Sequence, residues 1–291
     1  MDLPSAPTPA LVYWRRVRSK MGGAAPRPMM LTLYIVGYLI FLVVISEVLT
    51  RLPLALGLGF WVLTPLALIP WWLSVYAAAQ PLWTAFLWVK LFSVITANLW
   101  IAASRRYAGR LSAAAIGVPL YLFLICNILE AVAWDLLHAN VLNAMAGVLL
   151  VVLTPGWRAF SVEGERPQEL RYAVSPGWLA SYTLWDLAFV YGNWESVITG
   201  QHVAVLGAPI LTALCSGGSR YMQARAQTLG LHLMIFASAF MWVRERFDTS
   251  AWRDADALLV TQLVSLAAAL ALAVARREAL LGRARGRARA H

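Results

Sequence analysis

The chain has 291 residues, of which 60% are hydrophobic and only 13% are charged. A soluble globular domain usually carries about 25% charged residues, because its surface has to face water. The composition therefore excludes an ordinary soluble domain. The net charge of +10 comes largely from short Arg clusters between apolar runs. Such clusters are typical of loops that anchor membrane spans, and no soluble region is large enough to form a face that binds nucleic acid.

The N-terminal part of the chain changes character near residue 30. Residues 1–30 are a basic leader with several Pro residues, which we expect to be disordered. The apolar run 31–50 is about 20 residues long, enough to cross a hydrocarbon core of ~30 Å. It is longer than the apolar region of a cleaved signal peptide, so we expect it to be a retained first span.

Further apolar runs follow at short intervals. Their approximate limits are 54–76, 83–104, 112–134, 139–157, 176–197, 201–217, 223–243 and 256–276. Because runs of this length satisfy their backbone in a membrane as helices, the sequence predicts an all-α, integral membrane helical bundle of about nine transmembrane helices over 31–276. Residues 277–291 form a basic tail.

The run 201–217 is the weakest of the nine, because it is short and contains Gly207 and Pro209. Eight spans and one re-entrant segment are the alternative. The distribution of bases favours nine spans: if all the runs cross, one side of the membrane holds 15 Lys and Arg residues and the other holds three, without the leader. If 201–217 does not cross, the split falls to ten against eight.

The positive-inside rule then gives an orientation for the bundle. The side with more bases includes the tail 277–291, which we expect in the cytoplasm, whereas the N-terminus lies in the periplasm. The expected location is the bacterial cytoplasmic (inner) membrane, with membrane lipids as partners.

Three ionisable residues lie well inside predicted spans. They are Lys90 in the third, Glu130 in the fourth and Asp186 in the sixth. Each costs roughly 2.5–3.5 kcal/mol at the centre of a span, so each needs a partner or a function. Since Lys90 can neutralise one acid, we expect either Glu130 or Asp186 to pair with it and the other acid to keep its proton and titrate near neutral pH.

Helical spacing places other polar residues on the same faces and at similar depths as these charges. They predict one polar pocket open toward the periplasm, lined by Lys90, Asn127, Glu130, Asn143, Tyr182, Asp186 and Asn193. Secondary candidates are Trp134, Asp135 and Trp185 near the polar faces, and Arg225, Gln227 and His232 deeper in the membrane, toward the cytoplasmic side. The alternative is that the same residues only hold helices together. Gly147 is expected to let another helix approach closely.

The motifs of common enzymes are missing from the sequence. It contains no zinc-protease His-Glu-x-x-His, no phosphate-binding glycine loop and no Gly-x-Ser-x-Gly elbow. Cys126 and Cys215 lie in apolar runs without metal-ligand spacing. We therefore expect no metal, no cofactor and no assignable catalytic residue.

Five ordered blocks resemble a known family. They are Trp88-Val89-Lys90, Asn127-Ile128-Leu129-Glu130-Ala131, Asn143-Ala144-Met145-Ala146-Gly147, Tyr182-Thr183-Leu184-Trp185-Asp186 and Arg225-Ala226-Gln227-Thr228-Leu229. The sequence is similar over 31–275 to an uncharacterised bacterial polytopic membrane protein family, known as a domain of unknown function. The resemblance implies the membrane fold and the polar blocks, but no activity.

Three functions remain as expectations. The first is a membrane protein whose pocket binds or transports a small solute, in a process that protons could drive. The second is an intramembrane enzyme that acts on a lipid or isoprenoid, with Glu130 or Asp186 as general acid and Trp residues that shield a cation. The third is a structural or sensory membrane subunit.

Overall fold

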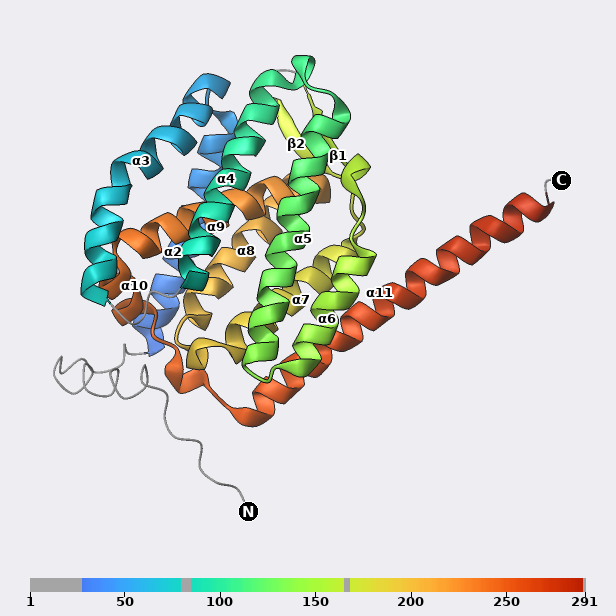
Figure 1. Cartoon of the computed structure of the whole chain (residues 1–291). Helices are drawn as coiled ribbons and strands as arrows, with labels where there is room; N and C mark the ends of the chain where they lie inside the picture. The colour runs from blue at the N-terminus through green and yellow to red at the C-terminus, as the bar shows by residue number, and fades with distance from the viewer. Residues whose placement is uncertain (1–27, 80–84, 165–167, 290–291) are drawn as a thin grey trace.

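A computed structural model describes residues 28–79, 85–164 and 168–289; the predicted leader therefore lies almost entirely outside the described residues. This part of the chain contains ten α-helices and one two-stranded sheet (Figure 1). In chain order the helices are α2 (Pro28–Arg51), α3 (Leu54–Ala79), α4 (Ala85–Tyr107), α5 (Ala113–Leu137), α6 (Val141–Leu153), α7 (Pro176–Gly192), α8 (Thr199–Ser216), α9 (Tyr221–Ser238), α10 (Phe240–Phe247) and α11 (Ala255–Arg289). The chain is thus a helical bundle with several apolar helices, as expected of a membrane protein.

Two helix starts show how the local sequence sets these limits. The Ser112 side chain accepts a hydrogen bond from the Ala115 N–H at 3.1 Å and caps α5. Ser175 caps α7 in the same way, and Pro176 occupies the first turn, where a missing N–H does no harm.

Helix length limits how many elements can cross a bilayer alone. Five helices of the described chain, α2, α3, α4, α5 and α11, are long and apolar enough, and a bent pair, α9 with α10, could form a sixth span. The predicted run 139–157 yields only the 13 residues of α6. At 1.5 Å per residue this helix is about 20 Å long, shorter than a hydrocarbon core of ~30 Å. The count of nine spans is therefore not confirmed.

The predicted helix 223–243 is broken in the structure. It divides into α9 and α10, which bend by 108° at a short break. Ala239 at the break leaves the helical conformation, with φ −132° and ψ 39°. Two indoles of α3 cover the break: the Trp71 Nε1–H donates to the Ser238 carbonyl at 2.6 Å, and the Trp72 Nε1–H donates to the Ser238 hydroxyl at 2.8 Å.

Helix α9 lies at the centre of the bundle, and 14 of its 18 residues are buried. Figure 1 shows α9 passing behind α4 and α5, at a large angle to both helices. One apolar core joins α9 to α2, α3, α4 and α10, and a second core joins it to α5, α6, α7 and α11. Because α9 contributes to both cores, its polar side chains are held between the two groups of helices.

The sheet is a hairpin in the connection 158–175, where no strand was expected. Strands β1 (Phe160–Glu163) and β2 (Glu169–Tyr172) pair antiparallel, with Phe160 opposite Tyr172. The hairpin packs on the bundle: the Leu170 N–H donates to Gln223 Oε1 of α9 at 2.7 Å, and Leu170 is 1% exposed.

Several of the predicted cytoplasmic loops meet on one end of the bundle. Arg105 at the end of α4 donates to the Thr50 carbonyl of α2 and to the Gln168 carbonyl before β2, both at 2.5 Å. Arg220 lies 3.1 Å from Glu47 of α2 and 3.3 Å from Glu169 of β2. The ends of α2 and α4, the hairpin and the start of α9 are therefore neighbours.

Candidate functional site

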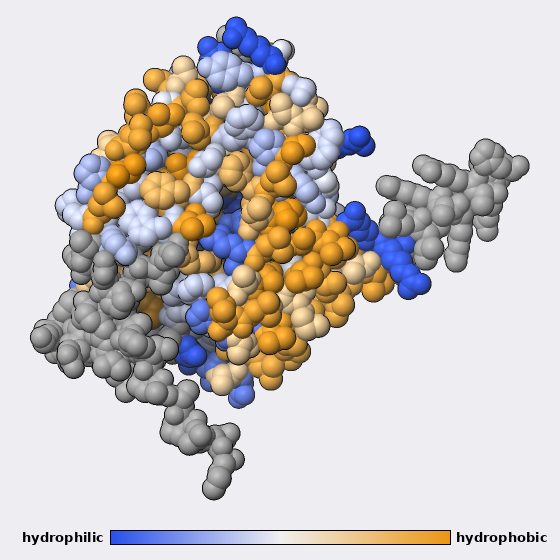
Figure 2. Space-filling view, viewed as in Figure 1, coloured by the Kyte–Doolittle hydropathy of each residue, from blue (hydrophilic) through white to orange (hydrophobic). Residues whose placement is uncertain are grey.

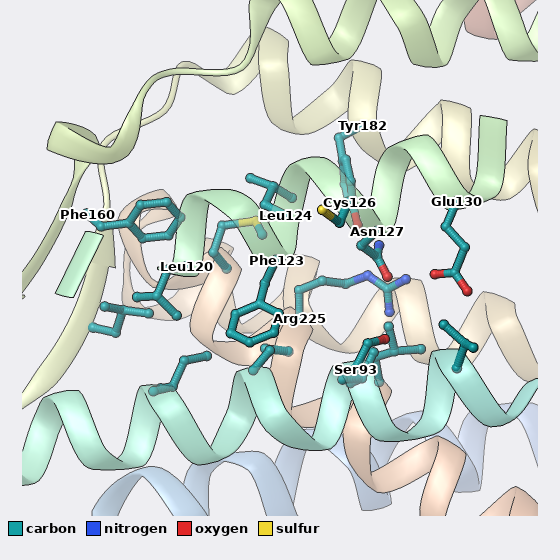
Figure 3. A pocket seen from close by; sticks show the side chains of 18 residues that line it. Ser93, Leu120, Phe123, Leu124, Cys126, Asn127, Glu130, Phe160, Tyr182 and Arg225 are labelled. Carbon is teal, nitrogen blue, oxygen red and sulfur yellow. The ribbon is translucent and has the colours of Figure 1, made fainter. Parts of the chain in front are cut away.

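A cavity of about 270 Å³ lies between α4 and α5, with α9, α7 and the hairpin behind it. One end is apolar: Leu120 and Leu124 of α5, Phe160 of β1 and Leu170 of β2 line it. Figure 3 shows Phe160 and Leu120 at this end, away from the polar groups. We call this cavity the α4/α5 pocket.

The other end of the α4/α5 pocket is polar. Its lining includes Ser93 of α4, Asn127 and Glu130 of α5, and Arg225 of α9. Figure 3 shows the Arg225 guanidinium between Asn127 and Ser93, with the Glu130 carboxylate beside them. The pocket is therefore amphipathic along its length.

Lys90 of α4 holds two of these residues in place. Its Nζ lies 2.9 Å from Glu130 Oε2 and donates to Asn127 Oδ1 at 2.7 Å. Asn127 and Glu130 are three residues apart on α5, so they share a face and meet the same ammonium group. The sequence analysis had predicted that these three residues line the same pocket, because they are polar and lie at similar depths.

Asp186 of α7 has its own partner. Arg225 Nη2 of α9 lies 2.5 Å from Asp186 Oδ2, and both side chains are buried. The expectation that one acid would lack a base is therefore wrong: Lys90 serves Glu130 and Arg225 serves Asp186. The prediction placed Arg225 deeper toward the cytoplasm, because it counted depth along an upright helix, whereas α9 is tilted.

The ion pairs leave some polar atoms at this end of the pocket without a partner. Arg225 Nε and Nη1 and Glu130 Oε1 are buried and have no hydrogen-bond partner among the described residues. Arg225 itself is only 4% exposed. Since a buried unpaired donor or acceptor costs about 1–3 kcal/mol, these three atoms mark a place where a ligand or water would gain hydrogen bonds.

The α4/α5 pocket opens on the side of the bundle. Its lining includes Val89 of α4, which is 57% exposed, and Cys126 of α5, which is exposed as well. Figure 2 shows hydrophilic side chains between α4 and α5, surrounded by the apolar outer surface of the bundle. The opening therefore faces the region that lipid chains would cover.

A second polar cluster lies between α5, α6, α7 and α11. Asp135 at the end of α5 accepts hydrogen bonds from Asn143 of α6 at 2.7 Å and from Asn193 after α7 at 2.9 Å. Ser265 of α11 donates to Asn143 at 2.8 Å, and Gln262 of α11 donates to Asn140 at 2.9 Å. These groups satisfy one another, which suits a role in joining helices.

The prediction of one shared pocket needs correction. Asn143 and Asn193 belong to the cluster around Asp135, and neither lines the α4/α5 pocket. Asp135 and Glu130 are five residues apart on α5, so they point to different sides of the helix. The prediction grouped these residues because they lie at similar depths, but they point from different helix faces into two separate clusters.

The aromatic candidates lie beside the pocket or behind it. Tyr182 of α7 lines the pocket and stacks on Trp178 at 5.1 Å between ring centroids. Trp134 packs against Phe86 at 4.6 Å, and Trp185 packs on Gly147. No Trp lines the α4/α5 pocket of the described chain.

The remaining candidates on α9 contact α2 and α8. Gln227 Oε1 accepts hydrogen bonds from Ser46 at 2.9 Å and from Thr50 at 3.0 Å. His232 Nδ1 lies 3.0 Å from the Tyr38 hydroxyl, and the centroids of the His232 and His202 rings are 4.9 Å apart. Both side chains are buried away from the pocket lining, so they join helices. In the described part of the chain, no three His, Cys, Asp or Glu side chains are grouped to hold a metal ion.

Several lining residues were not singled out from the sequence. Phe160 and Leu170 reach the pocket through the hairpin, and their alternation with Ser161 and Arg171 is the period-two signal of a strand. Ser93 and Phe123 lie on long apolar runs in which no local pattern distinguishes a pocket wall from a lipid-facing surface.

Comparison with known proteins gives a family and no activity. No curated protein and no solved structure matches the chain. A family model described as a family of unknown function, DUF5692, matches residues 26–285, from before α2 into α11, and so covers most of the chain. The chain therefore belongs to this family of unknown function.

Proposed function

We propose that this membrane protein binds a small amphipathic, lipid-like molecule, which enters the α4/α5 pocket sideways from the bilayer. The observation that carries the proposal is a cavity with an apolar end and a polar end whose opening lies on the apolar side of the bundle. A ligand in the bilayer has the same division between a chain and a head group, and it reaches this opening without crossing water.

The proposal includes an orientation in a bacterial inner membrane. The end of the bundle that holds Arg105, Arg220 and the hairpin faces the cytoplasm, together with the C-terminus, because bases are retained on that side. In this orientation all nine predicted runs contribute to the bundle, and the short α6, α7 and α8 are held by their neighbours. The polar end of the pocket then lies nearer the periplasm, and the apolar end lies nearer the cytoplasm.

The lining favours this ligand over a water-soluble solute. Most of the pocket wall is apolar, and a polar solute would lose its hydration there without matching hydrogen bonds. A role in catalysis has less support, since both acids proposed for it are already held by bases: Glu130 lies 2.9 Å from Lys90, and Asp186 lies 2.5 Å from Arg225. A purely structural role would not explain a cavity of about 270 Å³ beside charged groups.

The test is to fill the cavity and to identify what the protein carries. Leu124 is 6% exposed and lines the pocket, whereas Leu122 is 53% exposed on the outer side of the same helix. Leu124→Trp should place an indole in the cavity, and Leu122→Trp should only replace one lipid-facing group with another. Both variants and the unchanged protein are purified in mild detergent, and bound molecules are identified by native mass spectrometry.

We expect an amphipathic molecule to accompany the unchanged protein and Leu122→Trp, and to be lost from Leu124→Trp. Thermal unfolding followed for all three checks that the fold survives. Equal recovery of the same molecule from all three folded proteins would show that it binds elsewhere and would contradict the proposal.

A further inference from the structure

We infer that the ligand of the α4/α5 pocket carries a small uncharged head group that both accepts and donates hydrogen bonds, such as a hydroxyl. This inference rests on the proposed function and adds the chemical class of the ligand. It follows from the charge at the polar end of the pocket, from the three unpaired polar atoms there, and from the shape of the apolar end.

The charges at the polar end already balance. Two bases, Lys90 and Arg225, face two acids, Glu130 and Asp186, in two ion pairs of 2.9 Å and 2.5 Å. A phosphate or an ammonium head group would add an unbalanced charge in a site with little access to water, where an uncompensated ion costs several kcal/mol. The site therefore disfavours charged head groups of either sign.

The unpaired atoms specify what an uncharged head group must offer. Arg225 Nε and Nη1 are donors and call for acceptors, and Glu130 Oε1 is an acceptor and calls for a donor. One hydroxyl can accept from the guanidinium and donate to the carboxylate at the same time. Figure 3 shows the guanidinium and the carboxylate at the same end of the pocket, which is the arrangement that such a group needs.

The apolar end of the pocket takes the rest of the molecule. Along α5 the lining extends from Glu130 to Leu120, ten residues, which is about 15 Å at 1.5 Å per residue. Phe160 and Leu170 of the hairpin close the far end. A single alkyl or isoprenoid chain of medium length fits this space, with its hydroxyl at Arg225 and Glu130.

The two cysteines of the chain provide a reporter and its control. Cys126 lines the pocket, and Cys215 of α8 is exposed elsewhere; the structure records both as free thiols. In the variant Cys215→Ser, the rate at which N-ethylmaleimide modifies Cys126 reports occupancy of the pocket. In Cys126→Ser, the rate at Cys215 reports any general effect of an added compound on the micelle.

The probes share one chain and differ in the head group: decane, decan-1-ol, decyl methyl ether, decyl phosphate and decyltrimethylammonium. We expect decan-1-ol to protect Cys126 at a concentration at least about tenfold lower than decane, because its hydroxyl makes hydrogen bonds to two charged groups and decane makes none. The ether accepts but cannot donate, so it should lie between them. The phosphate and the ammonium should protect no better than decane.

Arg225→Lys separates recognition of the head group from stability. Lysine keeps a positive partner for Asp186 but lacks the two free guanidinium donors, so the advantage of decan-1-ol over decane should disappear while decane still protects. A normal thermal unfolding temperature for Arg225→Lys confirms that the fold is intact. If the variant does not fold, the probe series on the protein with Arg225 unchanged still decides the question.

The outcomes separate the two proposals. Preference for decyl phosphate or for decyltrimethylammonium would overturn the uncharged head group while supporting a lipid-like ligand. Equal protection by all five probes would also overturn it. Failure of every probe, decane included, to protect Cys126 would contradict the proposed function itself.

Discussion

The ion pair of Lys90 and Glu130 connects α4 to α5 beside the pocket, at 2.9 Å. Lys90→Met leaves the Glu130 carboxylate without its base, and Glu130→Met leaves the ammonium without its acid. We expect each to lower the free energy of unfolding by about 3–5 kcal/mol, because breaking a buried pair leaves one uncompensated charge. The double variant, with Met at both positions, should recover most of the loss.

Chemical unfolding in mixed micelles measures this double-mutant cycle. Strictly additive losses, with the double variant as unstable as the sum of the singles, would mean that the two side chains do not interact. Cys215→Ser, a change on an exposed residue of α8, serves as the control and should leave the free energy of unfolding within about 0.5 kcal/mol.

The sequence predicted that Lys90 pairs with an acid, but it left open whether the partner is Glu130 or Asp186. Lys90 and Glu130 are both charged residues in long apolar runs, so each required a partner at a similar depth. The pairing of Asp186 with Arg225 could not be found in that way. Depth counted along the sequence assumes upright helices, and the tilt of α9 depends on packing between two separate cores.

At the scale of elements, Gly147 sets the distance between α6 and α7. A Cβ at Gly147 would lie 2.4 Å from Val132 Cγ2 and 2.7 Å from Trp185 Nε1, which confirms the predicted close approach. Gly147→Ala should therefore destabilise the protein by about 1–3 kcal/mol. Gly59→Ala in α3 is the matched control, because nothing lies within 4 Å of its Cβ position.

Thermal unfolding of the two glycine variants measures the difference. In a helix Ala is favoured over Gly, so Gly59→Ala should be neutral or slightly stabilising. Equal unfolding temperatures for the two variants would show that α6 and α7 can move apart without loss of stability.

One side chain of α9, Gln223, binds a buried backbone N–H of the hairpin. Gln223 Oε1 accepts from the Leu170 N–H at 2.7 Å, and Gln223 Nε2 donates to the Thr50 hydroxyl at 3.0 Å. Gln223→Ala leaves the buried Leu170 N–H unpaired, which should lower the free energy of unfolding by about 1–3 kcal/mol. Hydrogen exchange at Leu170 should become faster in this variant, while exchange in α5 and α11, which Gln223 does not contact, stays unchanged. Unaltered exchange at Leu170 would mean that the hairpin is held in another way.

Helix positions were easier to predict than helix ends and breaks. The runs 54–76 and 112–134 correspond to α3 and α5 within three residues, since a long apolar run leaves few alternatives in a membrane. No Pro or Gly lies at the break at Ala239, so the local sequence does not predict it. Two Trp side chains from α3 stabilise it, and such a distant contact leaves no local signal in the sequence.

For the whole molecule, the proposed orientation predicts which surfaces are accessible from outside the cell. Gly109 lies at the end with the hairpin, and Ala251 lies before α11 at the opposite end; both are exposed. In a background without Cys126 and Cys215, a membrane-impermeant thiol reagent should label Ala251→Cys in intact cells. It should label Gly109→Cys only after the membrane is opened. The reverse pattern would invert the orientation.

The location of the pocket could not be derived from the sequence. Hydropathy indicates the depth of a residue in the membrane, and helical spacing indicates which residues share a helix face. Neither indicates toward which neighbouring helix that face points. Asn143 and Asn193 share their approximate depth with Glu130, yet they face Asp135 in another cluster. The apolar half of the pocket includes the hairpin, whose docking depends on side chains far apart in the chain.

The proposed function requires an amphipathic molecule in the space between α4 and α5. A high-resolution density map of the protein in lipid nanodiscs would show whether one is there. We expect elongated density that extends from Arg225 and Glu130 to Phe160 and ends in a small head group between the two charged side chains. Side chains that close the space between Leu120 and Glu130, or a pocket filled only by separate water peaks, would contradict it.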